Sequence, residues 1–140
     1  MRAFLRLIAI LSLSFGFIFA SDYREIKEIV LKKDEQKKIL VKYADKEKLF
    51  QFRWTLYKNG GLVLFRSYDK IVAQHVLYLR HENQSFRVEL MPKGANYNNS
   101  AYLLVKFKEF KQDSKEAVFE IFIFDSKGQV LLEDLKEQIK

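Results

Sequence analysis

The stretch from residue 50 to residue 68 limits the fold of this chain more than any other. Apolar and polar residues alternate through its first half: Phe50, Phe52, Trp54 and Leu56 fall on one set of positions, and Gln51, Arg53, Thr55 and Tyr57 on the other. A period of two places the two sets on opposite faces of a β-strand. Asn59-Gly60 then supplies the positive φ angles of a tight type I′ turn. The pattern predicts a hairpin whose aromatic row faces a core.

Short apolar stretches with turn residues between them continue along the rest of the chain. About eight strands are expected: the two of the hairpin and others near residues 37–43, 71–80, 86–90, 102–110, 118–125 and 129–133, while residues 22–33 fit either a helical stripe or a strand at 29–31. Regular short strands of this kind are typical of antiparallel sandwiches and barrels. We therefore expect an all-β fold in one domain, with an immunoglobulin-like antiparallel sandwich as the first expectation. A closed lipocalin-type barrel is the alternative.

The first 20 residues differ in character from the rest. Arg2 and Arg6 flank a run rich in Leu, Ile and Phe, Gly16 interrupts it, and Ala20 is a small residue at its end. This is the layout of a secretory signal peptide. We expect cleavage after Ala20, which leaves residues 21–140 as a single β domain in the periplasm or the medium, with no membrane span. An uncleaved N-terminal anchor is the alternative.

Composition narrows the possible means of stabilisation and the possible partners. The chain has no Cys, so no disulfide can form even though export would permit one. Apolar packing must hold the fold, and 13 Phe, 7 Tyr and one Trp are available for it. The formal charge is +7, and removing Arg2 and Arg6 leaves +5. A basic surface favours phosphate-bearing lipids, anionic polymers or acidic partners, although a compositional bias of the genome is the preferred explanation.

Motifs that would carry catalysis or bind a metal are missing from the sequence. His75 and His81 lie six residues apart, which is about 20 Å along an extended strand and too far to share a metal ion. The sequence has no Gly-x-Ser-x-Gly elbow, no thiol and no phosphate-binding glycine loop. We therefore predict no catalytic residues, no metal and no cofactor, and an envelope inhibitor or enzyme remains a lesser alternative.

Two places are candidate recognition sites. The first is the loop from residue 92 to residue 100, whose composition resembles that of binding loops; its candidate residues are Gly94, Asn96, Tyr97, Asn98 and Asn99. The second is one face of the strand at 102–110, where aromatic and basic residues interleave: Tyr102, Lys106, Lys108 and Phe110. An ordinary connector is the alternative for the loop. A solvated face guarded by lysines is the alternative for the strand, and export argues against nucleic acid as its partner.

The segment from residue 118 to residue 124 is apolar on both faces. Phe119, Ile121 and Ile123 can fill a core, and Val118, Phe122 and Phe124 then point the other way. The outer faces of a two-layer sandwich are normally wet, so the second row should be covered. Three covers are possible: the segment from Tyr23 to Leu31, the tail through Leu135 and Ile139, or another protein. Residues 71–80 show the same doubling.

These observations lead to one functional expectation. We expect an exported, non-catalytic binding or assembly module of the periplasm or cell envelope that acts through protein–protein contacts, with an envelope protein or a second copy as partner. A β-barrel that carries an apolar small molecule is the alternative. A filled core favours the module, and a large apolar hollow favours the carrier.

Overall fold

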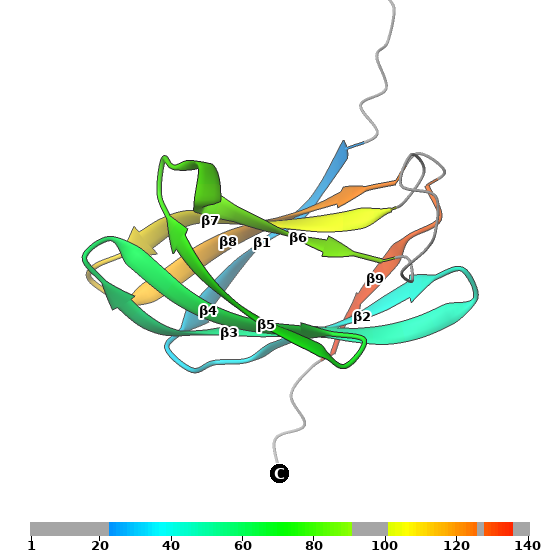
Figure 1. The fold of residues 1–140 in the computed structure, drawn as a ribbon, viewed down its shortest axis with the longest axis horizontal. Coiled ribbons are helices and arrows are strands. Elements are labelled where there is room, and N and C mark those ends of the chain that lie inside the picture. Colours follow the sequence, from blue (N-terminus) through cyan, green and yellow to red (C-terminus); the bar gives the residue numbers. More distant parts are fainter. Residues whose placement is uncertain (1–22, 91–100, 126–127, 136–140) are drawn as a thin grey trace, which may run out of the picture.

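The computed structural model describes residues 23–90, 101–125 and 128–135, which form two antiparallel sheets packed face to face (Figure 1). The four-stranded sheet has the order β1-β8-β7-β6 and consists of β1 (Tyr23–Lys32), β8 (Glu116–Phe124), β7 (Tyr102–Lys111) and β6 (Ser85–Glu89). The five-stranded sheet has the order β5-β4-β3-β2-β9 and consists of β5 (Ile71–Tyr78), β4 (Gly61–Tyr68), β3 (Lys46–Lys58), β2 (Lys37–Tyr43) and β9 (Leu131–Asp134). The predicted antiparallel sandwich is confirmed. The sheets do not close into the alternative barrel.

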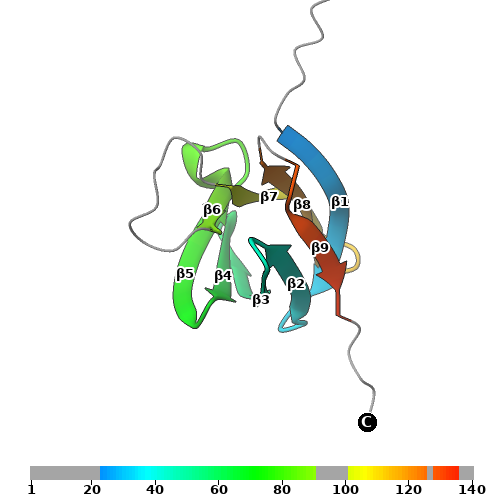
Figure 2. The ribbon, with the colours of Figure 1, turned by 90° about the vertical axis from the view of Figure 1, so that its right-hand side faces the viewer.

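Each sheet is built mainly from strands that follow one another in the chain. β2 to β5 form a meander in one sheet and β6 to β8 a meander in the other, joined by a short 3₁₀ turn, η1 (Glu82–Gln84). β1 adds to β8 and β9 adds to β2, so the first and last strands lie on the same side of the sandwich (Figure 2). This order differs from the Greek-key exchange of strands between sheets that characterises immunoglobulin domains.

Three two-residue turns connect the strands of the β2–β5 meander. Asn59-Gly60, Ala44-Asp45 and Asp69-Lys70 all have positive φ at both positions, the backbone of a type I′ turn. The twist of this turn matches that of the strands it joins, which holds the hairpins in register. The hairpin predicted at residues 50–68 is confirmed by this register, in which Phe50 lies opposite Tyr68 and Lys58 opposite Gly61.

Aromatic rings fill the space between the sheets. Phe52 of β3 meets Phe119 of β8 edge to face at 5.3 Å between ring centroids, and both are buried. Trp54, 3% exposed, donates from Nε1 to the carbonyl oxygen of Leu31 at 2.8 Å, while its own carbonyl accepts from the N–H of Asp34 at 2.9 Å. Trp54 thereby fixes the β1–β2 connection, where the chain passes from one sheet to the other.

A β-bulge at Thr55 overturns part of the predicted hairpin face. Trp54 lies opposite Leu64 and Leu56 lies opposite Val63, so Thr55 is an extra residue in β3. The extra residue reverses the alternation beyond it. Leu56 is 48% exposed on the outer face, and Tyr57 packs against the core. The prediction that Leu56 faces the core and Tyr57 the solvent is therefore wrong.

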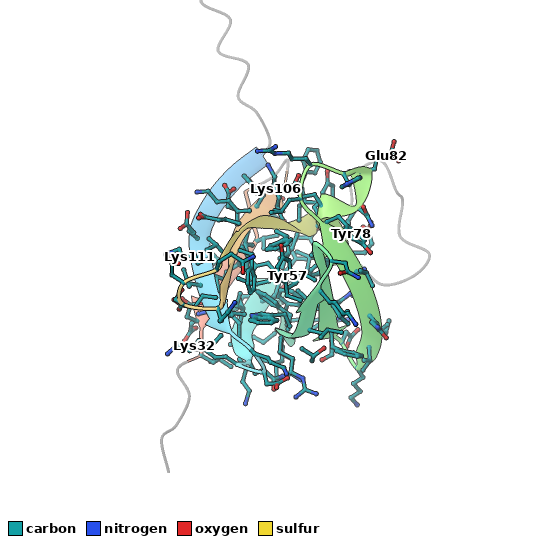
Figure 3. The ribbon with its side chains drawn as sticks, turned by 90° about the vertical axis from the view of Figure 1, so that its left-hand side faces the viewer. Lys32, Tyr57, Tyr78, Glu82, Lys106 and Lys111 are labelled. Carbon is teal, nitrogen blue, oxygen red and sulfur yellow. The ribbon has the colours of Figure 1, made fainter. Side chains whose placement is uncertain are left out.

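A second bulge lies in β7, at the same end of the sandwich. Phe107 pairs with Phe119 and Glu109 with Val118, which leaves Lys108 as the extra residue. Beyond it Phe110 turns inward and stacks on Tyr57 at 3.9 Å, and the two rings close this end of the core. Figure 3 shows Tyr57 between the two sheets at the end facing the viewer.

Candidate functional site

The residues of the predicted recognition loop lie outside the described residues: Gly94, Asn96, Tyr97, Asn98 and Asn99. The structure describes the residues on either side of the loop. Leu90 and Ala101 are both buried, and the N–H of Leu90 donates to the carbonyl oxygen of Ala101 at 3.1 Å. The residues that flank the loop therefore lie side by side at the end of the β6–β7 pair, and the role of the loop in recognition stays a prediction.

The basic-aromatic face is only partly assembled. Tyr102 and Lys106 share the outer face of β7, but the bulge removes Phe110 from it, so the prediction that all four residues lie together is wrong for Phe110. Lys108 reaches across β8 and pairs with Glu28 of β1 at 2.7 Å. That contact lowers the pKa of the Glu28 carboxyl, first through the hydrogen bond and then through the charge of Lys108.

A short chain of stacked groups replaces the predicted face. The guanidinium of Arg87 lies 3.6 Å from the ring centroid of Tyr102, and the Tyr102 ring stacks on Phe124 at 4.8 Å. Arg87 also pairs with Glu89 on the same strand. Cation–π and stacking contacts of this kind stabilise exposed side chains of neighbouring strands. These contacts explain why the Tyr102 and Phe124 rings are stable on the outer face, and no bound partner is needed to explain it.

The predicted interface row on β8 is less accessible than its sequence indicates. Val118 is fully buried on the outer side, between Val30 of β1 and Glu109 of β7 in the two ladders. Phe122 and Phe124 are half-buried. β1 lies beside β8 as a strand of the same sheet, so the segment considered as a cover is a neighbour in that sheet. Leu135 is described and lies next to β9, and Ile139 lies outside the described residues.

Exposed apolar side chains lie instead on the outer face of the five-stranded sheet. We call this set the outer aliphatic face: Leu49, Leu56, Val72, Val76, Tyr78 and Leu131, each at least one-third exposed. The registers explain how they come to share it. Each alternates along its strand with residues that fill the core, and Leu56, Val63 and Val76 lie opposite one another across β3, β4 and β5.

A polar row interrupts the outer aliphatic face near its middle. Gln36 Nε2 donates to Gln51 Oε1 at 2.8 Å, and Gln51 Nε2 donates to Ser67 Oγ at 3.2 Å. Arg53, Phe65, Arg66 and Val72 complete the lining of a shallow hollow of about 330 Å³ above these residues. These hydrogen bonds fix the amide side chains of Gln36 and Gln51. The outer aliphatic face therefore has exposed apolar side chains on both sides of a rigid polar row. Such a mixture is common in non-obligate protein interfaces.

The sequence contains a signal for part of this face. Residues 71–80 are apolar on both sides, and β5 supplies Val72, Val76 and Tyr78 to the outer aliphatic face. Leu56 was missed because the bulge at Thr55 has no signature in a single sequence. Leu131 was missed because its outward position depends on pairing with Lys42 of β2, a contact between distant parts of the chain.

Two titratable groups meet on the inner side of the β4–β5 hairpin. Arg66 Nε donates to His75 Nε2 at 3.2 Å, and the imidazole stacks on Phe86 at 4.5 Å. Burial, and then the charge of Arg66, lower the pKa of His75 from 6.5. Burial also lowers the pKa of Arg66. The imidazole is therefore neutral and accepts at Nε2, which makes it an internal partner for the guanidinium.

Nothing in the described part of the chain assembles a metal site, since no three of its His, Asp and Glu side chains come together. No helix among the described residues is long and apolar enough to span a bilayer. Comparison with known proteins gave no match to a family model, to a curated protein or to a solved structure.

Proposed function

We propose that the protein is an exported, non-catalytic module of the periplasm or cell envelope that binds or assembles through protein–protein contacts. The observation that carries the proposal is the outer aliphatic face. In a chain with 31% charged residues, six large apolar side chains are exposed together on one side of one sheet. Apolar side chains gathered on one face are the usual mark of an interaction site.

The proposed location, in the periplasm or cell envelope, rests on the first 20 residues, whose layout is that of a secretory signal peptide. Intact mass of the protein recovered from the periplasm or medium tests this part of the proposal. We expect a chain that begins at Ser21. A chain that retains residues 1–20, or one found only in the cytoplasm, contradicts export.

The interior favours a module over a carrier of small molecules. Phe50, Phe52, Phe107 and Phe119 are fully buried and touch one another between the sheets. A carrier needs an apolar hollow of several hundred Å³ at this place. Aromatic side chains occupy it here, so the surface is left as the place where a partner can bind.

A pair of valines offers a matched test of the contact surface. Val76 of β5 is 39% exposed on the outer aliphatic face, and Val30 of β1 is 37% exposed on the outer face of the other sheet. We expect Val76→Lys to stay folded and to lose the partner captured from envelope extract, because a lysine cannot be desolvated at an apolar contact. Val30→Lys should retain that partner. Equal capture by both variants, with unfolding temperatures unchanged, contradicts the proposal.

A further inference from the structure

The two sheets end in four edge strands, and three of them carry features that prevent pairing with another chain. β1 holds five charged residues and a bulge between Glu25 and Lys27. β6 is five residues long and includes an Arg and a Glu, and β9 is four residues long and ends in Glu and Asp. Charges, bulges and short length are the usual protections of a sheet edge.

β5 has none of these protections. It is eight residues long, pairs with β4 without a bulge, and contains no Pro and no Lys, Arg, Asp or Glu. The stretch from Ile71 to Leu79 is the longest run without a charged side chain among the described residues. Val72 is 70% exposed and Ile71 56%. A long, uncharged edge without a bulge is a template for another strand.

The register identifies the backbone groups that this edge offers. The Asp69-Lys70 turn makes Tyr68 and Ile71 a hydrogen-bonded pair, and pairs alternate along an antiparallel ladder. Val72, Gln74 and Val76 therefore direct their N–H and C=O groups away from β4. One contact agrees with this assignment: Asn83 Nδ2 donates to the carbonyl oxygen of Val76 at 3.2 Å from outside the sheet.

We propose that β5 pairs with β5 of a second copy, antiparallel, about a two-fold axis at Ala73. In this register Val72 of each copy lies opposite Gln74 of the other, and the two residues exchange both backbone hydrogen bonds. Four bonds form, and they use every edge-directed group of Val72 and Gln74. Asn83 already occupies the carbonyl of Val76, so a register centred on Gln74, which places Val76 opposite Val72, would have to displace Asn83 in each copy.

Charge favours a second copy over a foreign strand. The chain carries a formal +7, or +5 without Arg2 and Arg6, so an acidic partner would be drawn to its lysine-rich surfaces, and β5 has no charge to attract it. The net positive charges of two copies repel each other, and this repulsion is weakest where the contacting strands carry no charge. Contact between the β5 strands of two copies meets this condition. The inference rests on the proposed function, which holds that the protein assembles through protein–protein contacts. It names one partner, a second copy of this chain.

Gln74→Pro tests the backbone pairing directly. The Gln74 N–H points away from β4, so proline removes no bond within the sheet and is tolerated at such an edge position. Each dimer loses two of its four bonds, and the dissociation constant should rise about tenfold or more. Gln74→Ala keeps the N–H and should stay within about threefold of the wild type. Sedimentation velocity over a range of concentrations, on protein purified after expression of the full chain, measures both.

A charge exchange tests the register. Val72→Lys should weaken the dimer, and Val72→Lys combined with Gln74→Glu should restore it, because the introduced ammonium of each copy then faces the introduced carboxylate of the other. Val30→Lys, at a site 37% exposed on β1 of the other sheet, should leave the dimer unchanged. Amide exchange should show protection of Val72 and Gln74 that grows with protein concentration.

Three results would overturn the inference. They are a monomer at all concentrations, a dimer unaffected by Gln74→Pro, and fast exchange of the Val72 and Gln74 amides when the dimer is present. None of them bears on export or on capture of a foreign partner by the outer aliphatic face, so failure here is separable from failure of the proposed function.

Discussion

Replacing Trp54 tests how the centre of the sandwich is held. The side chain is 3% exposed, meets Phe110 edge to face at 5.6 Å, and donates to the carbonyl oxygen of Leu31. Truncation of a buried aromatic to alanine costs about 3–5 kcal/mol. An aromatic contact adds about 0.5–1.5 kcal/mol to burial and an orphaned carbonyl costs about 1–3 kcal/mol. We therefore expect Trp54→Ala to destabilise by about 4–5 kcal/mol, near the top of the range for such truncations.

Urea unfolding followed by circular dichroism measures this loss, and two neighbours test the bulge at Thr55. Leu56→Ala should change stability by roughly 0.5 kcal/mol or less because Leu56 lies on the surface. Tyr57→Ala should cost clearly more, since its ring stacks on Phe110 at 3.9 Å. A costly Leu56→Ala beside a neutral Tyr57→Ala would refute the bulge and restore strict alternation.

Three further predictions concern titration and a turn. Burial, and then Asp69, raise the pKa of Tyr68 to about 12; folding should therefore lose stability as pH rises from about 10 towards 12, and Tyr68→Phe should remove the last tyrosine step in absorbance at 295 nm. The lowered pKa of His75 means that stability should fall as pH drops through 6.5 and level off below the folded-state pKa; His75→Gln should flatten this loss in urea unfolding at pH 5–7. Asp125 Oδ2 accepts from the N–H of Val130 at 2.7 Å, so Asp125→Ala should cost about 1–3 kcal/mol, measured by thermal unfolding.

Periodicity and turn chemistry were sufficient to predict the fold class and the central hairpin. Phe50, Phe52 and Trp54 are buried as their alternation indicates, and Asn59-Gly60 forms the expected turn. Both signals are local, because side chains alternate between the two faces of a strand with a period of two residues and a type I′ turn spans four residues. The antiparallel sandwich follows from repeating such local signals along a chain of this length.

The bulges at Thr55 and Lys108 could not be predicted in the same way. Each is a mismatch of one residue between two strands, and a single strand's sequence carries no record of its partner's register. Their effect on the candidate faces was large. Leu56 moved out to the surface, and Phe110 moved from the predicted basic-aromatic face into the core.

The remaining differences between the predicted and the observed faces come from pairing between strands that are distant in the sequence. β1 joins β8 across most of the chain, and this neighbour helps to bury Val118 on the face predicted to be an interface. The absence of charge from Ile71 to Leu79 is visible in the sequence, but its meaning depends on β5 being an edge. In the middle of a sheet the same residues would indicate only burial on both faces.

Site-specific photo-cross-linking in cells tests most directly whether the protein acts through contacts made by its five-stranded sheet. A photoreactive residue at Val72, the most exposed aliphatic position of β5, should give a light-dependent product of twice the chain's mass. The product should weaken when Gln74→Pro is added, and the same residue at Val30 should not give it. No cross-linked product of any mass from position 72, or an equal product from position 30, would contradict the account.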